Sequence, residues 1–151
     1  MTSINYAAVI TFPAVFATLY AAHHVGDHWV QTHRQACVKG EPTKAGQRAC
    51  LWHVFTLALT KLAALFMLVF VTGLPLTWWT LFAGLLLDAA THYWADRRYT
   101  LKALAERLGK GDYYTLGLPE AAPCGTGAYA LDQSWHVGWL FFTSLIIAAG
   151  A

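Results

Sequence analysis

Aspartate and histidine residues recur in this chain at a spacing of four. The chain has only five aspartates and seven histidines, so chance would give about half of one such mixed pair. Four pairs are present, and residues four apart lie on one face of a helix, so each pair can present both side chains to a common point. The pairs are His23 with Asp27, Asp88 with His92, His92 with Asp96, and Asp132 with His136.

Carboxylates and neutral imidazoles are the ligands that suit a divalent transition metal. We expect one or two ions, with zinc the best match, and either a two-metal site or one metal supported by outer carboxylates. A metal would lower the pKa of bound water toward about 7, and an unligated carboxylate, Asp27 or Asp132, would act as the general base. The predicted ligands are His23, Asp27, His53, Asp88, His92, Asp132 and His136, and the predicted supporting residues around them are His24, Gln31 and Gln133.

Four apolar segments are long enough to hold these residues inside a membrane. The chain is 57% hydrophobic and 12% charged, whereas soluble domains carry about 25% charged residues. Crossing a bilayer takes roughly 20 residues in a helix, and the alternation typical of strands is absent. The sequence therefore predicts an all-α, polytopic membrane protein with one domain over residues 1–151. The expected helices cover about 6–31, 50–72, 75–96 and 130–150, with a short amphipathic interfacial helix at about 99–109.

Basic residues indicate the orientation of these segments. Nine of the ten Lys and Arg residues lie in the connections between the first and second and between the third and fourth segments. By the positive-inside rule these connections are cytoplasmic, which leaves both chain ends outside a bacterial cytoplasmic membrane. The exception, Lys61, lies near the middle of the second segment and must face the bundle interior unless that segment is misplaced.

The same orientation places the Asp and His residues at one depth. Each of the four segments contributes at least one of them near its basic end, roughly 5 to 16 Å below the surface at about 1.5 Å per residue. Ionisable groups are costly at this depth, so we expect them to meet one another or a metal. The expected partners are the lipid bilayer, with a homo-oligomer or a cytoplasmic protein left open. Nucleic acid is not expected, because orientation and lipid contact explain the basic residues.

Several of these residues also follow a known order. The elements His23-x3-Asp27-x3-Gln31 and Asp132-Gln133-x2-His136 resemble the signatures of a family of small bacterial and phage membrane proteins classed as a domain of unknown function. The likeness spans about residues 20–140, although His28 stands where the family usually has an aromatic residue. The resemblance implies the architecture and no activity. The positions whose importance it implies are His23, Asp27, Gln31, Asp88, Asp132, Gln133 and His136.

Three classes of function fit these patterns. The first is a metal-dependent hydrolase acting on a membrane-associated substrate, and the second is a proton or metal transporter subunit. The third is a non-catalytic phage or mobile-element membrane protein in which the polar cluster or a metal is structural. Coordination number separates the first from the third, because a catalytic site keeps a position for water. A transporter needs a polar path to the outer surface, which the segment LTWWTLFAGLL does not provide.

Overall fold

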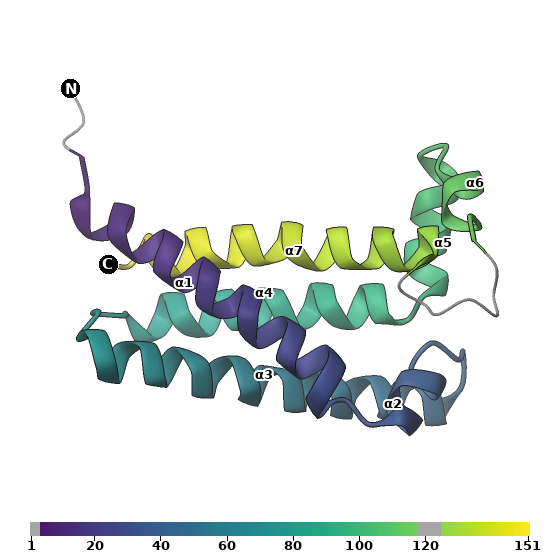
Figure 1. The fold of residues 1–151 in the computed structure, drawn as a ribbon, viewed down its shortest axis with the longest axis horizontal. Helices are drawn as coiled ribbons and strands as arrows, with labels where there is room; N and C mark the ends of the chain where they lie inside the picture. Colours follow the sequence, from purple (N-terminus) through teal and green to yellow (C-terminus); the bar gives the residue numbers. More distant parts are fainter. Residues whose placement is uncertain (1–3, 118–124) are drawn as a thin grey trace.

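The fold is a bundle of four long helices with small helices gathered at one end (Figure 1). A computed structural model describes residues 4–117 and 125–151. The start of α1, the α3–α4 connection and the C-terminus lie together at the opposite end, where Asn5 Nδ2 donates to the backbone oxygen of Ala151 at 3.3 Å. The helices are α1 (Tyr6–Val25), α2 (His33–Val38), α3 (Lys44–Thr72), α4 (Trp78–Asp96), α5 (Tyr99–Arg107), α6 (Gly111–Tyr114) and α7 (Gly127–Ala148), and a π-helical turn, η1 (Gly26–Val30), continues α1.

Within the described ranges the chain is helical and contains no strand, as its sequence predicts. Helix boundaries differ from the prediction where capping residues decide them. Helix α3 begins at Lys44 instead of residue 50, because the Thr43 side chain accepts a hydrogen bond from the Gly46 amide. Helix α7 likewise begins at Gly127 instead of residue 130, capped by Thr126. Helix α4 begins at Trp78 instead of residue 75, three residues beyond the proline expected in its first turn.

The π-helical turn was not predicted, and it lies where α1 passes close to α3. The Gln31 amide donates to the Gly26 carbonyl, a bond that spans five residues. A Cβ atom on Gly26 would overlap the buried Leu57 side chain of α3. Glycine therefore allows the close approach that brings η1 against α3, and π-helical turns are common at functional sites.

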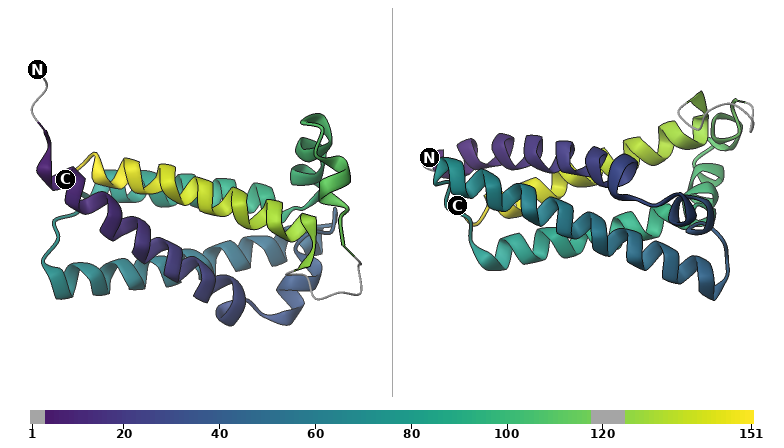
Figure 2. Two further views of the ribbon diagram at one scale, coloured as in Figure 1. Left: turned by 45° about the horizontal axis from the view of Figure 1, so that its top comes forward. Right: turned by 60° about the horizontal axis from the view of Figure 1, so that its bottom comes forward.

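Each long helix packs against its neighbours in the bundle. Helix α4 makes its most extensive contacts with α7, while α1 packs against both α7 and α3. The two views of Figure 2 show the long helices side by side, with α5 and α6 projecting at the end away from the C-terminus. Along the helix axes, the half of the bundle nearer the termini holds the apolar core, and the other half holds the clustered Asp and His residues. The core residues are Val15, Leu19, Leu65, Leu81, Leu140 and Ile147.

Two helical segments, Tyr6–Val30 and Lys44–Thr72, are long and apolar enough to cross a membrane. Helices α4 and α7 do not meet the same test of length and hydropathy, so the four-span bundle expected from the sequence is only partly supported. Both carry Asp, His and Trp residues, which lower their mean hydropathy.

Candidate metal centre

Six of the seven predicted ligands lie together at the basic end of the bundle, and Asp96 joins them. Five segments supply this cluster, whose residues could hold a metal ion and which we call the metal centre for that reason. Its imidazoles and Asp96 are buried, whereas the Asp132 side chain is 25% exposed. The members are His23 from α1, Asp27 from η1, His53 from α3, His92 and Asp96 from α4, and Asp132 and His136 from α7.

Four ligand atoms form the middle of the centre. The Nε2 atoms of His53 and His92 are 3.1 Å apart. Asp96 Oδ2 lies 3.3 Å from the first and 3.2 Å from the second, and Asp27 Oδ1 lies 3.0 Å and 3.6 Å from the same two atoms. With metal–ligand bonds of about 2.0 to 2.2 Å, neighbouring atoms of a tetrahedral shell are roughly 3.3 to 3.6 Å apart. The observed separations are close to these values.

Hydrogen bonding accounts for only part of the closeness of these groups, because it joins the two imidazoles through their Nε2 atoms but leaves two carboxylate oxygens without a donor. Neither Asp27 Oδ1 nor Asp96 Oδ2 accepts a hydrogen bond from any residue in the described part of the chain, although two imidazoles lie beside each oxygen. Buried carboxylate oxygens are costly without partners. A cation shared by the four atoms would satisfy them without requiring aligned N–H donors.

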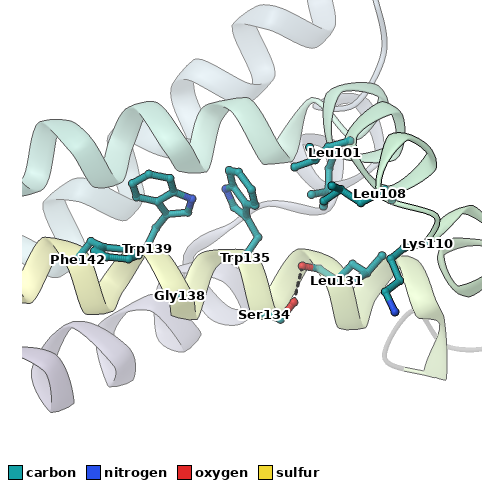
Figure 3. Close-up of a pocket in the computed structure, with 11 residues that line it drawn as sticks. Leu101, Leu108, Lys110, Leu131, Ser134, Trp135, Gly138, Trp139 and Phe142 are labelled. Carbon is teal, nitrogen blue, oxygen red and sulfur yellow. Dashed lines mark hydrogen bonds between the residues drawn. The ribbon is translucent and has the colours of Figure 1, made fainter.

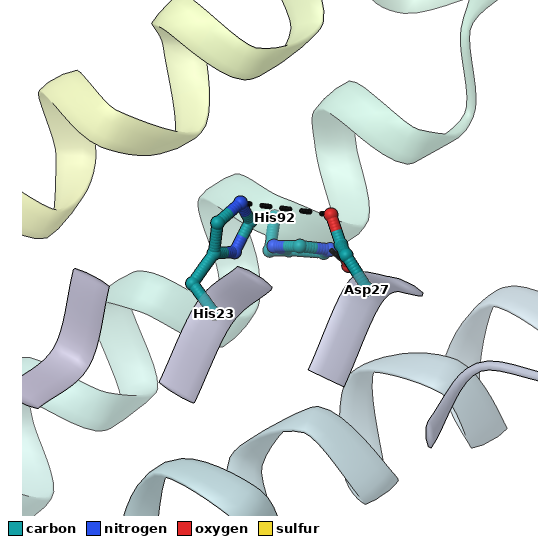
Figure 4. Close-up of side chains that lie close together, drawn as sticks. All are labelled: His23, Asp27 and His92. Carbon is teal, nitrogen blue, oxygen red and sulfur yellow. Dashed lines mark ion pairs between the residues drawn. The ribbon is translucent and has the colours of Figure 1, made fainter. Parts of the chain in front are cut away.

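His23 flanks the middle of the centre on one side. Its Nε2 lies 3.5 Å from Asp27 Oδ2, so the two oxygens of Asp27 face different imidazoles. Figure 4 shows the His23 and His92 rings close to each other and beside the Asp27 carboxylate. The His23 ring is fully buried, and neither of its nitrogens has a hydrogen-bond partner among the residues described.

His136 and Asp132 flank the other side. The His136 ring stacks on His92 with centroids 3.9 Å apart. Its Nε2 lies 3.4 Å from Asp132 Oδ1 and 3.8 Å from Asp96 Oδ1. The two oxygens of Asp96, like those of Asp27, therefore face different imidazoles: Oδ2 faces His53 and His92, and Oδ1 faces His136. Three sets of three residues have ligand atoms close enough to share an ion: His23, Asp27 and His92; His53, His92 and Asp96; and Asp96, Asp132 and His136.

Lys39 fixes the orientation of the Asp96 carboxylate. Its Nζ lies 2.8 Å from Asp96 Oδ1, which leaves Oδ2 toward the imidazole pair. Burial alone would lower the pKa of Lys39, but the Asp96 and Asp27 carboxylates outweigh it and hold that pKa above its ordinary value. The Arg97 guanidinium donates to the Lys39 carbonyl at 2.7 Å and to the Glu41 carbonyl, which holds the α2–α3 connection against α4.

One predicted ligand, Asp88, lies outside the centre. Its two oxygens accept hydrogen bonds from Lys61 Nζ at 2.8 and 2.7 Å. The fully buried lysine thus faces the bundle interior and pairs with a carboxylate that the spacing predicts as a metal ligand. Asp96 lies beside the imidazoles, where Asp88 was expected. The sequence contained the relevant signal, since Asp96 is four residues from His92.

The predicted supporting residues are divided between two places. Gln31 and Gln133 line a cavity beside the centre, and Gln133 Nε2 donates to Asp132 Oδ2 at 3.3 Å. The His24 ring instead packs between Tyr20 and His28, outside the three ligand sets.

A cavity of about 520 Å³ adjoins the centre at the basic end of the bundle. Asp27, Asp96 and Asp132 form part of its wall together with Lys39. Residues of α2, α5, α6 and the start of α7 complete it, so the centre borders a space large enough for water and part of a substrate.

Comparison with known proteins identifies the family and no activity. The chain matches the family described as "Protein of unknown function (DUF3307)" over residues 15–150, and it belongs to that family. The matched range includes the whole metal centre. No curated protein and no solved structure matches the chain.

Proposed function

We propose that this chain is a membrane-embedded metalloprotein that uses a divalent transition metal, with zinc the best match, to hydrolyse a membrane-associated substrate. The observation that carries the proposal is a group of imidazole and carboxylate atoms 3.0 to 3.6 Å apart, of which two residues, Asp27 and Asp96, also line a cavity. Each part of the proposal has its own support.

Exposed apolar surface supports the membrane location. In the most apolar stretches of Tyr6–Val30 and Lys44–Thr72, only 28% and 22% of the residues are buried. The core helix of a soluble protein would be mostly buried, and soluble proteins rarely expose large continuous apolar patches. The positive-inside rule then supports a bacterial cytoplasmic membrane, with the metal centre near its inner face. Large exposed side chains on α3 and α4 include Phe66, Met67, Phe70, Val71, Trp78, Trp79 and Phe82.

Charge balance supports a dication in the middle of the centre. His53 and His92 would bind as neutral imidazoles, while Asp27 and Asp96 each carry one negative charge. Asp132 adds a third negative charge to the cluster and Lys39 balances one, so a divalent ion would balance the two that remain, whose burial would otherwise be costly. The ligand set contains nitrogen and oxygen atoms and no thiolate, which suits zinc, iron or manganese.

Access to the cavity supports hydrolysis. Two of the proposed ligands, Asp27 and Asp96, line it, so water or a substrate carbonyl or phosphoryl oxygen can approach the ion from that side, and zinc can expand to five ligands during reaction. Asp132 is the best-placed general base, because it is the most exposed member and also lines the cavity. Asp27 is less suitable, since both of its oxygens face imidazoles.

Metal content tests the first part of the proposal. Protein purified in mild detergent should contain about one equivalent of a transition metal by elemental analysis, and His53→Ala and His92→Ala should each lose most of it, because each removes a ligand nitrogen. His33→Ala is the control: His33 is exposed and lies outside the ligand sets, so its loss should leave metal content unchanged. Fully folded wild-type protein without metal would refute the proposal.

Hydrolysis tests the second part. We would assay a p-nitrophenyl acyl ester and bis(p-nitrophenyl) phosphate in detergent micelles, with metal-loaded and chelated protein. Asp132→Asn should retain the metal and lower the rate by about 100-fold or more, the usual contribution of a general base. Equal rates in wild type and Asp132→Asn would exclude this role.

A structural metal is the second candidate, and the number of ligands favours it. Four protein ligands close a tetrahedral shell, as in structural zinc sites. In that case chelation would lower the Tm sharply, and the metal-loaded protein would hydrolyse neither probe. A transporter has less support, because the apolar core fills the half of the bundle beyond the centre.

A further inference from the structure

An apolar groove lies between α5 and α7, separate from the metal centre. Its volume is about 370 Å³, within the range of ligand sites. Its one lining hydroxyl, on Ser134, donates to the Leu131 carbonyl at 2.9 Å and needs no further partner. Figure 3 shows Phe142 at one end of the groove and Lys110 at the other. The apolar lining consists of Leu101, Leu104 and Ala105 from α5, Leu108 directly after α5, and Leu131, Trp135, Gly138, Trp139 and Phe142 from α7.

Indole rings form a fixed wall of this groove. Trp135 Nε1 donates to the Thr91 carbonyl of α4 at 3.2 Å, and its ring stacks on Trp94 with centroids 4.7 Å apart. Trp139 packs between Trp135 and Phe142, with centroid separations of 5.7 and 5.5 Å. Trp135 is therefore held against α4, and Trp139 is held by ring contacts within α7, so this wall of the groove is preformed.

The groove has a charged end and apolar walls, which matches the charged headgroup and apolar chain of a lipid. Lys110 lies at the basic end of the bundle, where the headgroups of the inner leaflet would be, and the groove runs from there along α7 toward the membrane interior. Neither Lys110 nor the nearby Arg107 forms an ion pair with a residue that the structure describes. Two exposed cations at the headgroup level attract acidic lipid.

We propose that this groove binds one acyl chain of an anionic phospholipid, with the lipid phosphate at Lys110. The apolar walls match the chain, the basic end matches the phosphate, and the fixed indoles limit the ordering cost of binding. The proposal rests on the membrane location proposed above, and it is independent of the metal.

Photo-crosslinking tests the site directly. The full chain would be placed in vesicles that contain phosphatidylglycerol with a diazirine on one acyl chain, and adducts would be mapped by peptide mass spectrometry. We expect adducts concentrated on the α5 and α7 residues of the groove. Adducts spread evenly over exposed apolar residues of α3, such as Phe66 and Phe70, would overturn the proposal.

A matched pair of variants at Gly138 provides the control. Gly138 lines the groove, and a Cβ added to it meets no atom within 4 Å. Gly138→Phe should fill the groove and remove most of the groove adducts, whereas Gly138→Ala should retain them. Equal adducts in the two variants, with unchanged helical circular dichroism, would overturn the proposal. Metal content should be unchanged in both, so failure of the groove is distinguishable from failure of the metal centre.

Lipid charge is the last test. Replacing labelled phosphatidylglycerol by labelled phosphatidylcholine should weaken crosslinking, and Lys110→Gln should reduce the preference for phosphatidylglycerol about fivefold, the effect of one basic residue at an acidic surface. No preference between the two lipids would remove the proposed role of Lys110. A dimer that Gly138→Phe dissociates would instead assign the groove to a second copy of the chain.

Discussion

At the scale of single residues, the Lys61–Asp88 pair is the most consequential feature outside the metal centre. Both side chains are buried, and two hydrogen bonds of 2.7 and 2.8 Å join α3 to α4. In an apolar environment each charge is tolerable only because the other is present. The intact pair therefore contributes little net stability, but removing one partner leaves an unpaired buried charge and destabilises the bundle strongly.

Breaking the pair should destabilise the protein strongly. Lys61→Met or Asp88→Asn alone should lower the free energy of unfolding by about 3–5 kcal/mol, because an unpaired polar group stays buried. The double variant Lys61→Met with Asp88→Leu should recover most of this loss. Denaturant titration in detergent measures both effects. Asp88→Asn should also keep its metal, and a selective loss of metal in folded protein would restore Asp88 as a ligand.

This pair also explains the limit of the sequence analysis at the residue scale. Asp88 and Asp96 are both four residues from His92, one on each side, so spacing alone cannot choose between them. Which aspartate joins the cluster depends on the residues that face α4 from other parts of the chain. Lys61 of α3 pairs with Asp88, whereas Asp96 contacts His53 and Lys39. Such contacts between helices leave no periodic pattern in either helix.

At the scale of elements, the four long helices and the short helix α5, expected at about 99–109 and found at Tyr99–Arg107, were predictable, whereas η1, α2 and α6 were not. The helices α1, α3, α4 and α7 could be predicted because each contains an apolar segment of about 20 residues, the length of a membrane-spanning helix. The turn η1 depends on a five-residue hydrogen bond and on the close approach of Gly26 to α3, which is a tertiary effect. Helix α2 depends on a capping box between Thr32 and Gln35, and with six residues it is too short to show a helical pattern of apolar residues in the sequence.

The contact between α4 and α7 gives a prediction at this scale. A Cβ added to Gly84 would lie 2.8 Å from Ile147 Cγ1 and 3.1 Å from the Thr143 carbonyl oxygen. Gly84→Ala should therefore push the helices apart and lower the free energy of unfolding by about 1–3 kcal/mol, as overpacking does. The same substitution at Gly138, which has open space, should be neutral or stabilise by up to about 1 kcal/mol. Equal effects at the two glycines would show that α4 and α7 are not closely packed.

At the scale of the whole molecule, the bundle separates its chemistry from its apolar support. The metal centre, its cavity and the charged end of the groove share one end, and the apolar core, the start of α1 and the C-terminus occupy the other. The distribution of basic residues predicted this polarity, because it places the polar ends of all four segments on one side. The neighbours of each helix could not be predicted, since several arrangements of four helices satisfy the same charge rule.

Cysteine accessibility tests the orientation of the whole molecule. Cys37 is exposed in α2 at the basic end, whereas Cys50 is fully buried and can stay in place. Cys124 lies outside the described residues, so it would be replaced by serine. In bacterial spheroplasts a membrane-impermeant maleimide should leave Cys37 unlabelled until the cells are lysed. An Ala151→Cys variant that also lacks Cys37 should be labelled before lysis, because the C-terminus lies at the opposite end of the bundle. Labelling of both positions from the outside would mean that the helices do not span the membrane as proposed, and labelling of Cys37 alone would invert the orientation and move the metal centre to the outer face.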